Sequence, residues 1–323
     1  MSDEIPVIQP VDREVQTMLD QANMPGQPRL VDMTPQEARD WCAELFIAIA
    51  DPVEVASITD HEVPVDGGEI ICRVYDPCPD EPLAVMVYIH GGGWVLGDLD
   101  GADPYVRRLA DTCRCVIVSV GYRLAPECPF PVPFEDCLTA VRWTASHAAE
   151  LGGVAGAPLA IGGDSAGGNL AAACALALRD EGTIELSCQF LIYPVIDDDF
   201  ERPSMITHAK GKLLEREVMQ WFWDHYCPEG AMRSDWRACP IKADSLAGLP
   251  PAIVTLASHD PLYDEGLEYA RRLEQSGVPV TLLVAPDLIH GYTGLADQFV
   301  RCREEVTRIN LAMSHLMGRV DSS

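Results

Sequence analysis

Apolar segments alternate with helix-length segments along most of this 323-residue chain, and no other feature constrains its fold as strongly. Several of the apolar segments are apolar almost throughout, as strands buried on both faces of a sheet are. The predicted strands are residues 67–77, 82–90, 114–122, 157–163, 188–195, 251–258 and 278–286, and the predicted helices 103–113, 135–151, 166–182, 263–277 and 296–316. The alternation predicts an α/β fold with a mostly parallel sheet, helices on both faces, and ligands at the carboxyl ends of the strands.

Two helical patterns precede the first predicted strand, at residues 11–22 and 34–50. Thr34 and Glu37 have the spacing of a capping box, and Pro35 stands at the first helical position. This combination indicates a helix that begins at Pro35.

A second region interrupts the alternation between residues 198 and 250, where no strand pattern is clear. It contains an amphipathic helical pattern at 213–227. A helix of this kind can be an ordinary core helix, but enzymes with this layout also need a cover that excludes water from the strand ends. We expect residues of about 1–50 and about 198–238 to form such a helical cap on a single domain that spans residues 1–323.

Charge and cysteine usage restrict the partners of the chain. It carries 23 basic and 50 acidic residues, a formal net charge of −27, and an acidic surface repels nucleic acid and anionic lipid. Its twelve cysteines show no metal-ligand spacing, and its first residues lack a secretory signal pattern. We expect a cytoplasmic protein with no nucleic-acid partner, no stable membrane association, no metal and no cofactor, and we leave homodimerisation open.

The stretch IGGDSAGGNL, residues 161–170, offers three interpretations. A phosphate-binding P-loop needs a Lys followed by Ser or Thr, which this stretch lacks, and a dinucleotide turn needs a GxGxxG frame near the first strand. The frame here is Gly163-x-Ser165-x-Gly167, between a predicted strand and a predicted helix. A serine in such a tight turn projects its hydroxyl above the sheet, so the pattern predicts a nucleophile at Ser165.

A serine nucleophile requires backbone donors for an oxyanion, a general base and an orienting acid. The glycine run HGGGW, residues 90–94, follows a predicted strand and supplies unobstructed backbone N–H groups. Asp260 and His290 follow the last two predicted strands, in the chain order serine, acid, histidine that this architecture uses. His259 is a weaker candidate for the base, and Asp264, Glu265 and Asp287 are weaker candidates for the acid. Asp264 and Glu265 have the position of helix-capping residues in the first turn.

These motifs resemble those of a known family. HGGGWVLGD (90–98), YRLAPE (122–127), GDSAGGNL (163–170), DPLYDEG (260–266) and HGY (290–292) are similar to the motifs of the hormone-sensitive-lipase-like branch of the α/β-hydrolases, the bacterial family IV carboxylesterases. The resemblance spans nearly the whole chain. It implies an α/β-hydrolase core with a helical cap.

The resemblance also implies an activity and a set of site residues. It makes Ser165, Asp260 and His290 the catalytic triad of a serine carboxylesterase that cleaves short-chain acyl esters. It makes the backbone N–H groups of Gly92, Gly93 and Ala166 the oxyanion donors, with His90 holding the glycine loop. The residues expected to line the substrate pocket are Trp94, Tyr193, Trp221 and Phe222.

Two alternatives to ester hydrolysis follow from the same residues. A related hydrolase could use the triad on an amide, carbamate, lactone or formamide. A non-catalytic small-molecule receptor on this scaffold is a second alternative, and the presence of His290 argues against it.

Overall fold

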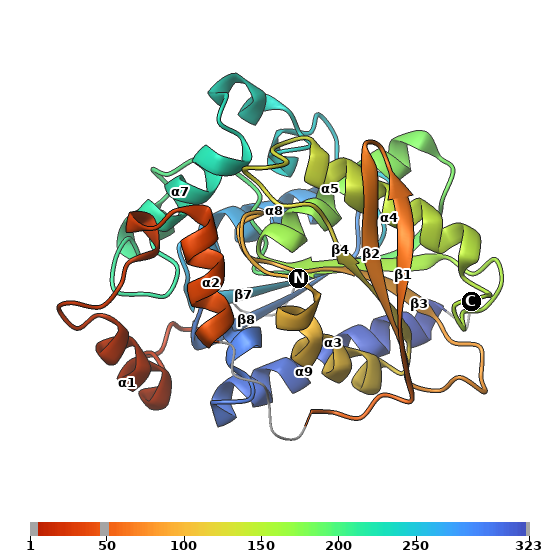
Figure 1. The fold of residues 1–323 in the computed structure, drawn as a ribbon, viewed down its shortest axis with the longest axis horizontal. Coiled ribbons are helices and arrows are strands. Elements are labelled where there is room, and N and C mark those ends of the chain that lie inside the picture. The colour runs from red at the N-terminus through yellow and green to blue at the C-terminus, as the bar shows by residue number, and fades with distance from the viewer. Residues whose placement is uncertain (1–5, 46–51, 321–323) are drawn as a thin grey trace.

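One eight-stranded sheet runs through the computed structural model, which describes residues 6–45 and 52–320 (Figure 1). Its strand order is β1-β2-β4-β3-β5-β6-β7-β8. Strands β3 to β8 are parallel to one another, whereas β2 is antiparallel to both β1 and β4. The strands are β1 Ser57–Val65, β2 Gly68–Asp76, β3 Val85–Ile89, β4 Val116–Gly121, β5 Leu159–Asp164, β6 Leu186–Ile192, β7 Ala252–His259 and β8 Val280–Ile289.

All seven predicted strands are present, as β2 to β8, but β1 was missed. Only Val63 of β1 is buried, because this edge strand has no sheet neighbour beyond β2. Its sequence is therefore mostly polar and contains Pro64. The two-residue turn Asp66-Gly67, with Gly67 at φ 77°, was the available signal for a hairpin.

Helices cover both faces of the sheet, as predicted (Figure 1). Val85, Val87 and Ile89 of β3 pack on the side of α4, α5 and α8. Met86 and Tyr88 point to the opposite side, toward α3 and α9, as the alternation of side chains along a strand requires. The helices are α1 Arg13–Ala22, α2 Pro35–Leu45, α3 Leu99–Cys113, α4 Val132–His147, α5 Ala166–Glu181, α6 Pro203–Thr207, α7 Arg216–Tyr226, α8 Tyr263–Gln275 and α9 Val300–Val320.

The capping box at the start of α2 is confirmed. The backbone N–H of Thr34 donates to the Glu37 carboxylate at 2.8 Å, and the N–H of Glu37 donates to the Thr34 hydroxyl at 3.3 Å. The structure has α2 as far as Leu45, and residues 46–50 of the predicted helix lie outside the described residues.

Three helices gather at one side of the molecule: α1, α2 and α7 (Figure 1). Arg39 of α2 donates to the carbonyl of Val95, in the loop that follows β3. Arg29, which precedes the short 3-10 helix Leu30–Asp32, pairs with Glu217 of α7 at 2.5 Å. Within the described residues, none of the helices combines the length and apolar character needed to cross a membrane.

Candidate active site

The turn between β5 and α5 carries Ser165 in a strained backbone conformation. Its φ is 54°, a region that non-glycine residues rarely adopt. A Cβ on Gly167 would lie 1.9 Å from the carbonyl oxygen of Ile89, and one on Gly163 would lie 2.4 Å from the same atom. Both glycines are therefore required by the close approach of β3, as the sequence pattern predicts.

His290 joins Ser165 to Asp260. His290 Nε2 lies 2.9 Å from Ser165 Oγ, and Nδ1 lies 2.7 Å from Asp260 Oδ2. A carboxylate oxygen accepts, so Nδ1 carries the proton and Nε2 is free to accept the serine proton. Asp260 is 1 % exposed, and its other oxygen accepts the backbone N–H of Leu262 at 2.8 Å. The arrangement is that of a nucleophile, a base and an orienting acid.

The structure places the rival candidates elsewhere. His259 Nε2 lies 2.7 Å from the carbonyl oxygen of Gln9, which accepts its proton. Asp287 forms an ion pair with Arg301. Neither is within hydrogen-bond distance of His290 or Ser165.

Asp264 and Glu265 lie in the first turn of α8, as predicted, but their side chains do not cap that helix. The Asp264 carboxylate accepts the backbone N–H of Ser204 at 2.7 Å. Glu265, fully buried, accepts the N–H groups of Ile196 and Asp197 at 2.8 and 3.3 Å. Both carboxyl groups therefore bind neighbouring loops, and the side chain that accepts an N–H of the first turn of α8 is that of Ser204, whose hydroxyl lies 3.1 Å from the Asp264 nitrogen.

The loop of residues 90–94, here called the oxyanion loop, offers free backbone donors beside Ser165. Gly92 and Gly93 have φ values of 106° and 61°, and the Gly92 carbonyl accepts N–H groups from Val95 and Leu96. Within the described part of the chain, the N–H groups of Gly92, Gly93 and Ala166 have no hydrogen-bond acceptor. Ala166 opens α5, so the positive end of that helix faces the same region.

His90 holds this loop, as expected. Its Nδ1 donates to the Gly91 carbonyl at 2.7 Å, and its ring stacks on Tyr122 at 4.4 Å between centroids. The Tyr122 hydroxyl donates to the His90 carbonyl at 3.0 Å. Burial lowers the pKa of His90, which favours the neutral imidazole. Sequence reasoning gave no role to Tyr122 or Asp164, although the motifs YRLAPE and GDSAGGNL contain them, because their partners His90, Tyr88 and Gly91 are remote in the chain.

Two of the four predicted pocket residues touch the site. The ring of Tyr193 lies 4.6 Å from that of His290, between centroids, and Phe222 packs against Gly93. Trp94 is fully buried and stacks on Tyr226 at 4.1 Å, so the contacts observed for it are packing contacts. Trp221 is half-buried, with its ring against His225 and Phe222. Lining of a substrate pocket by these four residues stays a prediction.

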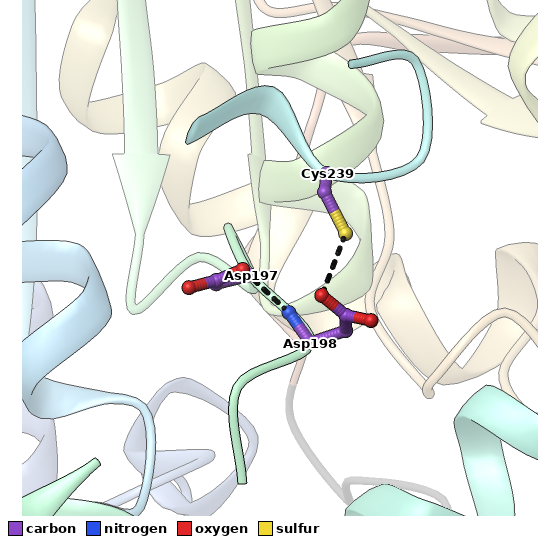
Figure 2. A group of neighbouring side chains, drawn as sticks. All are labelled: Asp197, Asp198 and Cys239. Atoms are coloured by element: carbon purple, nitrogen blue, oxygen red, sulfur yellow. Dashed lines mark hydrogen bonds between the residues drawn. The ribbon is translucent and has the colours of Figure 1, made fainter. Parts of the chain in front are cut away.

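A separate group of potential metal ligands lies after β6. Asp197, Asp198 and Cys239 point toward one another (Figure 2). Arg202 binds Asp197 at 2.6 Å, and Lys242 binds Asp198. Burial raises the pKa of Cys239, which favours the thiol over the thiolate that metals prefer. Two side-chain cations already neutralise the two carboxylates, so the group fits an internal ion-pair cluster better than a metal site.

The chain is similar to known proteins over most of its length. A model of the alpha/beta hydrolase fold family matches residues 86–294. Carboxylesterase NlhH of Mycobacterium tuberculosis is 43% identical over 246 residues, which cover 74% of this chain and 76% of that protein. The ethyl acetate hydrolase of Pseudomonas putida is 39% identical over 231 residues, which cover 70% and 72%.

Solved structures extend the likeness over nearly the whole chain. The alpha/beta hydrolase LAE6, from the metagenome of Lake Arreo, Spain, has a TM-score of 0.90 and 36% identity, covering 97% of this chain and 99% of that one. A thermostable esterase from Pseudomonas putida has a TM-score of 0.90 and 32% identity, covering 98% and 99%. The chain therefore belongs to the alpha/beta hydrolase fold family, and it is an enzyme of the serine carboxylesterase type.

Proposed function

We propose that this enzyme hydrolyses carboxylic esters with Ser165 as nucleophile, His290 as general base and Asp260 as orienting acid. The observation that carries the proposal is the unbroken chain of contacts from Ser165 Oγ through both ring nitrogens of His290 to Asp260 Oδ2. Asp260 is buried and keeps the proton on Nδ1, so Nε2 is available to the serine hydroxyl.

The reaction has two halves. His290 Nε2 takes the proton of Ser165 as Oγ attacks the ester carbonyl, and the resulting imidazolium gives that proton to the departing alcohol. The acyl group remains on Ser165 until water, deprotonated by His290, attacks it and releases the acid.

The oxyanion of each tetrahedral intermediate is held by the N–H groups of Gly92, Gly93 and Ala166. Among the residues that the structure describes, none accepts a hydrogen bond from these three groups, which supports this role. Removing one such donor costs about 3 kcal/mol of transition-state stabilisation, so the loop supplies a large part of the rate.

Short-chain acyl esters are the proposed substrates, and the hormone-sensitive-lipase-like branch is the proposed subfamily. A relative of 39% identity carries the name ethyl acetate hydrolase, which supports a small substrate. The motifs HGGGW and GDSAGG support the subfamily.

We also propose that the region of α1 and α2 and the segment 198–238 cap the strand ends. The ties from Arg39 to Val95 and from Arg29 to Glu217 support such a cap. Of its N-terminal part, residues 1–5 and 46–50 lie outside the described residues.

The expected partners and location stay predictions: a small ester, no nucleic acid, no stable membrane association, a cytoplasmic site, and homodimerisation left open. The acidic charge of the chain is the basis for expecting no nucleic-acid partner and no stable membrane association.

A substrate panel and a nucleophile variant test the function. The purified enzyme is assayed on p-nitrophenyl acetate, butyrate and palmitate, with acetate or butyrate expected to give the highest kcat/KM. Ser165→Ala is expected to abolish turnover, and paraoxon is expected to add one diethylphosphoryl group to Ser165, located by peptide mass spectrometry. Undiminished turnover in Ser165→Ala, or a label on another residue, overturns the proposal.

A further inference from the structure

Asp164 lies between the nucleophile and the oxyanion loop. It is the last residue of β5 and directly precedes Ser165. Its Oδ1 accepts two hydrogen bonds, from the backbone N–H of Gly91 at 2.9 Å and from the hydroxyl of Tyr88 at 2.7 Å. Tyr88 and Gly91 belong to β3 and the loop that follows it, so one carboxylate bonds the neighbouring strand at two points.

The contact between this carboxylate and the loop is close. A Cβ on Gly91 would lie 2.4 Å from Asp164 Oδ2, so the loop backbone rests directly against the carboxylate. Gly91 immediately precedes Gly92 and Gly93, whose N–H groups have no acceptor within residues 6–45 and 52–320. The bond from Gly91 to Asp164 therefore sets how far those donors stand from Ser165.

Other bonds keep the loop folded without this one. His90 bonds the Gly91 carbonyl, Tyr122 bonds the His90 carbonyl, and the Gly92 carbonyl accepts two backbone N–H groups. None of these ties reaches the turn that carries Ser165. Loss of the Asp164 bond would consequently shift the loop relative to the nucleophile rather than unfold it.

We propose that Asp164, oriented by Tyr88, is a positioning residue that fixes the distance between the oxyanion donors and Ser165. The inference rests on the proposed function, because it assigns the loop its oxyanion role. Its physical basis is the steep dependence of catalysis on geometry, in which a displacement of about 1 Å costs about 100-fold in rate.

Four variants separate this role from folding. Asp164→Ala removes the acceptor, and Tyr88→Phe removes only the hydroxyl that orients it. Asp164→Asn keeps an oxygen that accepts both bonds. The matched control is Tyr105→Phe, since Tyr105 is also buried, its ring lies 5.5 Å from that of Tyr88, and its hydroxyl donates instead to Asn310 at 3.0 Å.

The readouts are kcat and KM on p-nitrophenyl butyrate and the Ki of an alkyl trifluoromethyl ketone. A serine nucleophile attacks the carbonyl carbon of such a ketone, and the carbonyl oxygen becomes an oxyanion. In Asp164→Ala, kcat is expected to fall about 100-fold and the Ki to rise by the same factor, with KM within about twofold. Tyr88→Phe is expected to show about a tenfold change in the same direction, and Asp164→Asn less than about threefold. Tyr105→Phe is expected to leave all three quantities unchanged.

Two results overturn the proposal. The first is that Asp164→Ala and Tyr88→Phe have the same kcat and Ki as the control Tyr105→Phe. If Asp164→Ala does not fold, the comparison of Tyr88→Phe with Tyr105→Phe decides. The second is an Asp164→Asn variant as impaired as Asp164→Ala, which would assign the effect to the charge. Failure of the proposed function is distinguishable, because the wild-type enzyme would then resist the ketone or Ser165→Ala would retain turnover.

Discussion

The ring of Phe222 lies so close to the backbone of Gly93 that a Cβ on this glycine would be 2.2 Å from two of its carbon atoms. Phe222 belongs to α7, and Gly93 belongs to the oxyanion loop. Trp223 and Tyr226 of the same helix pack on Trp94, the next residue of that loop. The helix is thus in direct contact with the backbone proposed to stabilise the oxyanion.

Gly93→Ala tests that contact. The added methyl group collides with Phe222, so the ring of α7 or the loop itself must shift, and we expect kcat to fall at least about 100-fold, as for the loss of one oxyanion donor. Gly182→Ala is the matched control, because Gly182 has φ 62° against 61° for Gly93 and nothing within 4 Å of its Cβ position. The control is expected to lose about 1–2 kcal/mol of stability and no activity. Wild-type kcat in Gly93→Ala would contradict the proposed donor role.

Asp260→Asn tests the orienting acid. An amide in place of the carboxylate favours the wrong tautomer of His290, and kcat is expected to fall about 10⁴-fold with folding intact. Asp287→Asn breaks the ion pair with Arg301 and is expected to lower Tm but not kcat. Steady-state kinetics and circular dichroism on both variants check the assignment, and an inactive Asp287→Asn with an active Asp260→Asn would reverse it.

Tyr226→Ala tests how firmly α7 is attached. Tyr226 is fully buried and stacked on Trp94, so its truncation is expected to lower the free energy of unfolding by about 3–5 kcal/mol. Trp221 of the same helix is half-buried, and Trp221→Ala is expected to cost about 1 kcal/mol. Urea unfolding of both variants gives the comparison. Equally small losses would mean that α7 is not anchored through Trp94.

Glu265→Gln tests a buried carboxyl group through pH. Burial raises the pKa of Glu265 well above its usual range, so the folded state keeps this proton at pH values where the unfolded state has released it. Stability contributed by the wild-type residue therefore falls as pH rises above the unfolded pKa. Glutamine can still accept the N–H groups of Ile196 and Asp197, so we expect Glu265→Gln to gain stability over wild type at pH 8 relative to pH 4.5.

Urea unfolding at the two pH values measures that gain. Exposed Glu268 of the same helix, which pairs with Arg202, provides the control, and Glu268→Gln is expected to show no gain at pH 8. An equal or larger gain at pH 4.5 in Glu265→Gln would contradict the prediction.

Removal of divalent cations tests the cluster of Asp197, Asp198 and Cys239. Because Arg202 and Lys242 already pair with the two carboxylates, dialysis against EDTA is expected to leave kcat and Tm unchanged. A lower kcat or a lower Tm after dialysis, with recovery on addition of Zn²⁺, would show that the cluster binds a metal.

The order of the elements and the residue types of the candidate site could be predicted from local patterns in the sequence. Burial on both faces makes strands such as β3, β4, β5 and β7 recognisable as apolar runs, whereas β1 lies at an edge, buries only Val63 and gives no such run. Ser165, Asp260 and His290 were predictable because each follows a strand, and strand ends of a parallel sheet meet at one edge. The capping box of α2 could also be predicted, because its two residues are only three positions apart in the chain.

The tertiary structure was needed to show that Asp260, and none of the weaker candidates, contacts His290, and to identify the residues other than His90 that hold the oxyanion loop. Glu265 binds the backbone of Ile196, which is 69 positions earlier in the chain. Asp164 reaches Gly91 across a strand pair, and Phe222 reaches Gly93 from a distant helix. Such contacts depend on how strands align and helices pack, and side-chain type alone does not encode a distance between remote segments. Local patterns therefore name the reacting groups, while packing sets the separations on which their chemistry depends.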